Sequence, residues 1–322
     1  MELRRLGRSG LAVSVVGLGC NNFGMRIDAE QTTAVVHAAL DAGITLFDTA
    51  DRYGTVPGTS EELLGRALGA RRDDVVLATK FGKPMQGTNG EDFSARGSRR
   101  YVRRAVTASL RRLGTDHIDL LWMHEPDPAT PVLETLEALD DLVTEGLVGY
   151  VGSSQFAAWQ VTDADWVART AGTTRFVGAQ NKYSLLDRRA EEELLPACRA
   201  LGIGLVPYFP LESGLLTGKY TAGAPAPAGS RLADPRFSGG LAGAPWAALD
   251  RLAAVATTYG VDLLDLAVGG LASEPGVASV IAGATTPEQV RANATAGQFR
   301  ADPVLREQLA RVVAPAPATL AR

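Results

Sequence analysis

The sequence has little of what a disulfide scaffold, a membrane protein or a nucleic-acid-binding protein needs. Its 322 residues include two cysteines, Cys20 and Cys198, which are too few for a disulfide framework and are expected to be free thiols. No apolar run reaches the ~18 residues of a membrane span, and the first eleven residues lack an apolar signal core. The net charge of −4 gives no indication of a nucleic-acid partner. We therefore expect a cytoplasmic protein with neither a membrane nor a nucleic-acid partner.

Several motifs for nucleotides and metals are also missing. Gly17-Leu18-Gly19-Cys20-Asn21-Asn22 has the first two glycines of a dinucleotide fingerprint but Asn22 in place of the third. The sequence contains no P-loop, no Tyr-x-x-x-Lys and no zinc-ligand spacing, and the prolines after His124 exclude a helical metal motif there. The sequence therefore predicts no Rossmann domain and no metal site.

What is present is an alternation of short apolar, β-rich runs with segments of helical period. The strand-like runs are residues 15–19, 45–48, 75–79, 118–123, 148–152, 176–180, 204–208 and 277–281. The helix-like segments are residues 29–42, 60–68, 99–113, 131–145, 157–170, 188–201 and 246–259. Parallel strands need such crossovers, and eight of these units close into a (β/α)8 TIM barrel. We expect one domain over residues 1–322; a doubly wound open sheet is the alternative.

Three further regions stand outside this alternation. Two short apolar runs flank Gly7-Arg8-Ser9-Gly10, which predicts an N-terminal β-hairpin that closes the bottom of the barrel. Residues 222–245 are rich in Gly, Ala and Pro and predict a long mobile loop after strand seven. The tail, residues 314–322, is predicted to be loose.

Three consecutive apolar runs end in an ionisable residue. Asp48, Lys80 and His124 close the second, third and fourth runs, and Tyr53 follows Asp48 by five positions. Catalytic groups of β/α barrels lie at the carboxyl ends of the strands, so we expect these four side chains to meet at one rim.

The four residues suit the reduction of a carbonyl group, which needs a hydride at carbon and a proton at oxygen. Tyr53 is predicted to donate the proton. Its ordinary pKa of about 10 is expected to be lowered by the Lys80 ammonium, which Asp48 holds in place. His124 is predicted to orient the carbonyl oxygen.

Three segments that carry these residues resemble the catalytic motifs of the aldo-keto reductases. They are Asp48-Thr49-Ala50-Asp51-Arg52-Tyr53-Gly54, Ala78-Thr79-Lys80 and Leu120-Leu121-Trp122-Met123-His124. The resemblance runs from about Leu6 to Asn293 and is strongest to the branch of bacterial reductases and potassium-channel beta subunits. It implies a TIM barrel and an extended nicotinamide cofactor at the barrel mouth.

The resemblance also implies which residues bind the cofactor. Ser153, Ser154 and Gln180 would hold the carboxamide, and Tyr208 would stack on the nicotinamide. The pyrophosphate would lie against Pro210, Leu211, Ser213 and Gly214, near Lys219, while the adenosine end would face Gly283, Thr285, Gln289 and Asn293.

The chain departs from the family pattern at several of these positions. Phe209 replaces a usual Ser, Gln155 a usual Asn and Ala292 a common Glu, and Gly283 and Gln289 stand where many members carry Lys and Arg. Arg231, with Lys219, is predicted to supply the missing positive charge for a 2′-phosphate. NADP(H) is therefore favoured over NAD(H).

A small, apolar-sided substrate pocket is predicted from residues that follow strands one and three. These are Asn22, Phe23, Met25, Phe81 and Met85. The arginines of residues 99–112 are interpreted as a solvated helix face. Three functions stay open: an NADP(H)-dependent carbonyl reductase, an NAD-dependent aldose or alcohol dehydrogenase, and a nicotinamide-binding regulatory subunit. The natural substrate and the oligomeric state are not encoded in these patterns.

Overall fold

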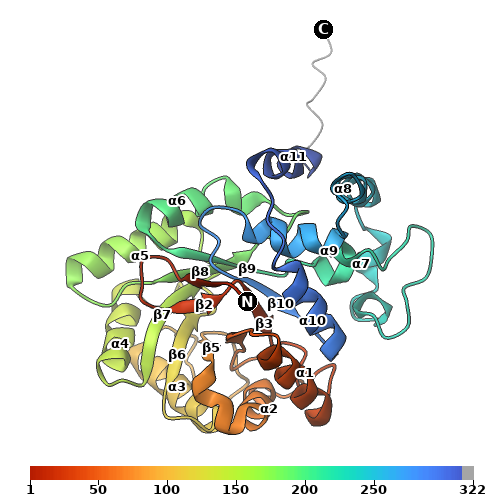
Figure 1. Ribbon diagram of the computed structural model, residues 1–322. Helices are drawn as coiled ribbons and strands as arrows, with labels where there is room; N and C mark the ends of the chain where they lie inside the picture. The colour runs from red at the N-terminus through yellow and green to blue at the C-terminus, as the bar shows by residue number, and fades with distance from the viewer. Residues whose placement is uncertain (314–322) are drawn as a thin grey trace.

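A closed barrel of eight parallel strands forms the centre of the protein, in a computed structural model that describes residues 1–313 (Figure 1). The predicted loose tail, residues 314–322, lies outside the described residues. The strands follow one another around the barrel in chain order. They are β3 (Val16–Gly19), β4 (Leu46–Asp48), β5 (Val76–Phe81), β6 (Ile118–Met123), β7 (Val148–Ser154), β8 (Gly178–Lys182), β9 (Gly204–Tyr208) and β10 (Val280–Gly283). The Leu205 backbone closes the ring, because it bonds with Gly276 and Ala278 just before β10. The TIM-barrel prediction is confirmed.

Helices surround the barrel on the outside (Figure 1). The main ones are α1 (Ala29–Asp41), α2 (Thr59–Leu68), α3 (Arg99–Leu113), α4 (Val132–Thr144), α5 (Ala158–Ala171), α6 (Leu194–Leu201), α8 (Trp246–Tyr259), α10 (Pro287–Ala296) and α11 (Pro303–Val313). At the start of α1, Asp28 accepts a bond from the Gln31 amide, and the Gln31 side chain accepts one from the Asp28 amide. At the end of α3, Gly114 takes the left-handed conformation that terminates many helices.

An N-terminal hairpin closes one end of the barrel. Strands β1 (Leu3–Arg5) and β2 (Ala12–Ser14) pair antiparallel, as predicted. Leu6 and Val13 are fully buried and pack with barrel-interior side chains such as Leu46, Leu120 and Val206. The hairpin therefore extends the core of the barrel.

Glycines on two strands make room for Trp122 inside the barrel. Trp122 on β6 is fully buried. A Cβ atom at Gly178 would lie 2.9 Å from Cη2 of the indole ring, and one at Gly152 would also collide with it. The absence of side chains at these positions of β7 and β8 is thus a packing requirement.

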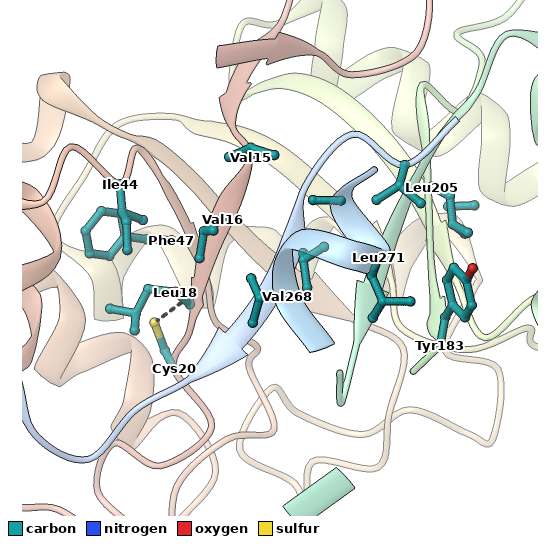
Figure 2. Close-up of a cluster of buried hydrophobic side chains, with 14 of the residues drawn as sticks. Val15, Val16, Leu18, Cys20, Ile44, Phe47, Tyr183, Leu205, Val268 and Leu271 are labelled. Carbon is teal, nitrogen blue, oxygen red and sulfur yellow. Dashed lines mark hydrogen bonds between the residues drawn. The ribbon is translucent and has the colours of Figure 1, made fainter. Parts of the chain in front are cut away.

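A larger core lies between the barrel and its helices. Figure 2 shows part of it, where Val16 and Leu18 of β3 lie between Phe47 and Val268. Cys20 follows β3 and is also fully buried. Cys20 and Cys198 are both free, as expected.

The structure corrects two predicted segments. The helix expected over residues 188–201 begins only at Leu194, after a short 3-10 turn (Arg189–Glu191). Pro196 then falls in the first turn of α6, where its missing amide hydrogen costs nothing. The expected loop over residues 222–245 contains a 3-10 turn, η4 (Arg231–Ala233), and the short α7 (Gly239–Ala242).

The pattern of apolar runs missed the helical segments near the carboxyl end. These are α9 (Leu263–Asp265), the π-helical turn Leu266–Gly270, α10 and α11. Among residues 1–313, no single helix is long and apolar enough to cross a membrane. Only α8 taken together with Leu263–Gly270 meets those criteria, and that pair is bent by 101°.

Candidate active site

The strand ends bring Asp48, Lys80, Tyr53 and His124 together at the rim of the barrel; we call these four residues the tetrad. Asp48 is the last residue of β4, Lys80 the penultimate residue of β5, and His124 directly follows β6. The His124 amide donates to the Phe81 carbonyl at 2.8 Å, which continues the β5–β6 pairing to the rim. The Lys80 Nζ atom lies 4.8 Å from the centre of the Tyr53 ring.

A buried ion pair forms the base of the tetrad. Lys80 donates to Asp48 Oδ2 and, at 2.7 Å, to the Thr49 carbonyl. The other Asp48 oxygen accepts a bond from Gln180 Nε2 at 2.9 Å. Both ionised side chains are almost fully buried, so these partners fix the ammonium in one position.

The pKa of Tyr53 moves in the direction opposite to the prediction. Burial raises it above its ordinary value; the Lys80 ammonium lowers it, but the Asp48 carboxylate beside the ammonium raises it again. Burial also tends to lower the pKa of Lys80, yet Asp48 and Tyr53 raise it above its ordinary value. Tyr53 is therefore protonated at neutral pH, which is the form that a proton donor needs.

His124 lies edge to face with Tyr53, with ring centres 5.8 Å apart and planes at 85°. Burial, together with the Lys80 and Lys83 cations, holds the pKa of His124 well below its usual range. The imidazole is therefore neutral, and its Nδ1 atom has no hydrogen-bond partner in the described part of the chain. A neutral ring can orient a carbonyl oxygen without adding charge to the site.

A cavity of about 350 Å³ lies beside the tetrad; Asp48 and Tyr53 line it, whereas Lys80 and His124 do not. Gln180 lines it as well, and so do Thr285 and Gln289. Other predicted cofactor residues that line it are Tyr208, Pro210, Leu211, Ser213, Gly214, Lys219, Arg231, Gly283 and Asn293. Residues 209–214 bend tightly, with positive φ at Phe209 and Glu212 through Gly214.

The cavity wall carries more positive than negative charge. Arg26, Lys219 and Arg231 line it, and their close contacts are with a carbonyl oxygen and aromatic rings. The two wall carboxylates, Asp48 and Glu212, are each paired with a lysine. This balance suits an anionic ligand.

Buried polar atoms without hydrogen-bond partners indicate whether a nicotinamide could bind at this site. Ser153 Oγ on β7 and Asn181 Oδ1 on β8 are buried and have no hydrogen-bond partner within residues 1–313, although neither residue lines the cavity. Asn22 Oδ1, on the cavity wall, has none either. Such atoms are costly unless a ligand or water satisfies them, and a carboxamide offers both donors and acceptors. The residues therefore fit the cofactor that the resemblance implies.

Some predicted site residues do not reach the cavity. Ser153 and Ser154 are buried and are not on its wall. Of the predicted substrate-pocket residues, Asn22 lines the cavity, whereas Phe23 and Phe81 pack in the hydrophobic core. Met85 is buried as well, and Met25 is partly exposed; neither lines the cavity. Apolar side chains next to strand ends gain more free energy by burial in the core than by lining a solvent-filled cavity.

Sequence reasoning missed two contacts at the site. Arg26 reaches across the cavity rim to the Gly229 carbonyl at 2.9 Å. Gln155 was predicted only as a departure from the family pattern. Its Nε2 atom donates to the His124 carbonyl at 3.0 Å, and its own backbone has a positive φ. Neither contact has a local sequence signal, because each joins segments far apart in the chain.

The chain that forms this barrel and the tetrad at its rim is similar to known proteins. The Aldo/keto reductase family model matches residues 15–313. The chain is 37% identical to a probable voltage-gated potassium channel subunit beta from Oryza sativa over 91% of this chain and 90% of that protein. It is 44% identical to the uncharacterized oxidoreductase YrpG of Bacillus subtilis over 68% of this chain and 69% of that protein.

The chain belongs to the aldo/keto reductase family. Membership implies NAD(P)H-dependent oxidoreduction of small carbonyl compounds.

Proposed function

We propose that this protein is an NADP(H)-dependent reductase that converts an aldehyde or ketone to an alcohol, with Tyr53 as the general acid. The observation that carries the proposal is the tetrad itself, in which a protonated phenol on the cavity wall lies next to a fixed ammonium and a neutral imidazole. A regulatory protein that only binds the cofactor has no need of this set.

Each tetrad residue has its own role in the proposed reduction. A bound nicotinamide supplies the hydride for the carbonyl carbon. Tyr53 Oη gives its proton to the carbonyl oxygen, and the phenolate left behind is stabilised by the Lys80 ammonium, which Asp48 holds in place. His124 donates to the carbonyl oxygen and orients it. Gln180 would hold the carboxamide, and the Tyr208 ring would pack against the nicotinamide.

The positive charge of the cavity supports NADP(H) over NAD(H). Arg231 lies on η4 with its guanidinium carbon 4.5 Å from the centre of the Phe237 ring and 5.8 Å from that of Phe209. Two aromatic rings thus hold the planar guanidinium at the wall, the geometry that suits a phosphate. Lys219 and Arg26 add two further cations.

The relative from Oryza sativa that is named as a channel subunit makes a cofactor-binding regulatory subunit the second candidate. A panel of aldehydes, ketones and aldoses, assayed with NADPH and with NADH, separates the candidates. We expect carbonyl-dependent oxidation of NADPH that exceeds that of NADH. Tight binding of NADPH without turnover of any carbonyl would support the regulatory candidate, and oxidation of alcohols or aldoses with NAD+, in a parallel assay with the oxidised cofactors, would support a dehydrogenase. The cytoplasmic location stays a prediction.

A further inference from the structure

A chain of buried polar side chains runs behind the tetrad. Asp51 Oδ2 accepts from Asn89 Nδ2 at 2.9 Å, and Asn89 Oδ1 accepts from Arg112 at 3.0 Å. The Arg112 Nε atom also donates to Glu61 at 2.6 Å, and the second Glu61 oxygen accepts from Thr79 Oγ1 at 2.6 Å. We call these five residues the Asp51–Thr79 network. The structure corrects the interpretation of Arg112 as part of a solvated face, because its side chain is only 11% exposed.

The network joins five separate parts of the chain. Asp51 lies in the segment after β4, Asn89 in the loop after β5, and Thr79 on β5 itself. Glu61 lies on α2 and Arg112 on α3. The turn before α2 is shaped around it, since a Cβ atom at the left-handed Gly58 would lie 2.8 Å from Arg112 Nε.

The charges of the network do not balance if both acids are ionised. Asp51 and Glu61 are fully buried carboxyls, and within residues 1–313 Arg112 is the one cation bonded to the network. Burial, with Glu61 nearby, raises the pKa of Asp51 well above its usual range. Asp51 Oδ1 has no hydrogen-bond partner within residues 1–313, and neither has the buried Tyr101 hydroxyl on α3. A neutral Asp51 would act as a hydrogen-bonding group, so an amide could replace it.

Both ends of the network touch the backbone of the tetrad. The Asp51 amide donates to the Lys80 carbonyl at 3.1 Å, and Thr79 precedes Lys80 on β5. Between Asp48 and Asp51, the Thr49 carbonyl accepts from the Lys80 ammonium at 2.7 Å. The Tyr53 amide donates to the Ala50 carbonyl at 3.1 Å, so residues 49–53 form one short bonded segment.

We propose that the Asp51–Thr79 network is a positioning device that sets the distance between the Tyr53 hydroxyl and the Lys80 ammonium by fixing residues 49–53 against β5. Asn89 is its removable link, because it alone joins the Glu61–Arg112 ion pair to Asp51. The effect on turnover rests on the proposed reductase function. The effect on the segment itself does not.

Asn89→Ala breaks the link and leaves the Glu61–Arg112 pair in place. We expect kcat for carbonyl reduction to fall about tenfold or more, since a misplacement of about 1 Å at a reacting group can cost about 100-fold. KM and the Kd for NADPH should stay unchanged, because no cavity-wall residue is altered. Thr88→Ala, at the exposed neighbouring position in the same loop, is the matched control and should leave kcat unchanged.

Asp51 offers a second pair of variants. Asp51→Asn keeps a neutral hydrogen-bonding group and should retain most of kcat, whereas Asp51→Ala should lose as much as Asn89→Ala. Rescue by the amide separates positioning through a hydrogen bond from a need for charge. Equal loss in both Asp51 variants, or a change of Asn89→Ala in KM alone, would overturn the proposal.

Hydrogen–deuterium exchange of the purified protein tests the same idea without turnover. Asn89→Ala should speed exchange at the amides of Thr49, Asp51 and Tyr53 and leave β6 unchanged. If the wild-type protein reduces no carbonyl, the proposed function fails, and the exchange result alone then decides on the network. Unchanged exchange over residues 49–53 would refute it in either case.

Discussion

His124 shows how burial sets the state of one residue in the tetrad. An imidazole that is buried beside two lysines is more stable without its second proton, although the same ring is protonated below pH ~6.5 in an unfolded chain. The neutral imidazole can donate a hydrogen bond, but its low pKa makes the folded protein less stable in acid.

The low pKa of His124 predicts how the stability of the protein depends on pH. Below pH ~6.5 the unfolded state binds a proton at His124 that the folded state does not, so stability falls as the pH falls. Between about pH 7 and pH 5, protonation of His124 in the unfolded state should lower the free energy of unfolding of the wild-type protein by about 2 kcal/mol. The His124→Asn variant should not show this part of the decrease. Urea unfolding at the two pH values measures it. His37→Asn, at an exposed position on α1, is the control, and an equal change there would speak against burial as the cause.

Arg231 carries the prediction of cofactor preference. Arg231→Met should weaken the binding of NADPH about 10- to 100-fold, the value of a charge-assisted hydrogen bond, and leave NADH binding unchanged. Fluorescence titration with both cofactors measures this. Arg236→Met, at an exposed position paired with Asp234, is the matched control. An equal loss for both cofactors would place Arg231 away from the 2′-phosphate.

At the scale of elements, strands were easier to predict than contacts between elements. Runs such as residues 118–123 and 204–208 coincide with β6 and β9, because an alternation of buried strands and amphipathic helices is a local property of the chain. The tetrad could be predicted too, since barrel strands bring their carboxyl ends to one rim. The Asp51–Thr79 network could not, because its five members come from five segments whose packing has no local signal.

The arginines of α3 illustrate the same limit. Arg99 and Arg103 were expected to face solvent, but Arg99 pairs with Glu137 of α4 at 3.0 Å and Arg103 with Glu145, directly after α4, at 2.7 Å. These pairs remain about half exposed and lie between two neighbouring helices. Ion pairs this exposed contribute little stability, because solvent screens them.

The contact of β6 with β8 gives a prediction at this scale. Gly178→Ala should destabilise the protein by about 1–3 kcal/mol, because the added methyl group meets the rigid Trp122 ring. Trp122→Phe should restore part of the loss in the double variant. Urea unfolding measures both. Gly239→Ala, where a Cβ atom meets nothing within 4 Å, is the control and should be close to neutral.

In the whole molecule, the hairpin and the catalytic rim occupy opposite ends of one barrel. The hairpin residues Leu6 and Val13 share a cluster with Trp122, which lies two positions before His124. The site therefore rests on a core that the first residues of the chain help to fill.

Truncation of a buried hairpin side chain should lower the free energy of unfolding of the protein. Leu6→Ala is expected to cost about 2–5 kcal/mol, the usual range for a leucine in a well-packed core. Leu3→Ala, on the same hairpin but 55% exposed, should have little effect. Urea unfolding of both variants compares them, and equal effects would mean that the hairpin is not part of the core.

The central claim is that the Tyr53 hydroxyl supplies the proton, and Tyr53→Phe tests it by removing that group alone. We predict that the variant binds NADPH with unchanged Kd and that its kcat for carbonyl reduction falls by about 100-fold or more, the range for loss of a general acid. A Tyr53→Phe variant that reduces carbonyls at the wild-type rate would contradict the account.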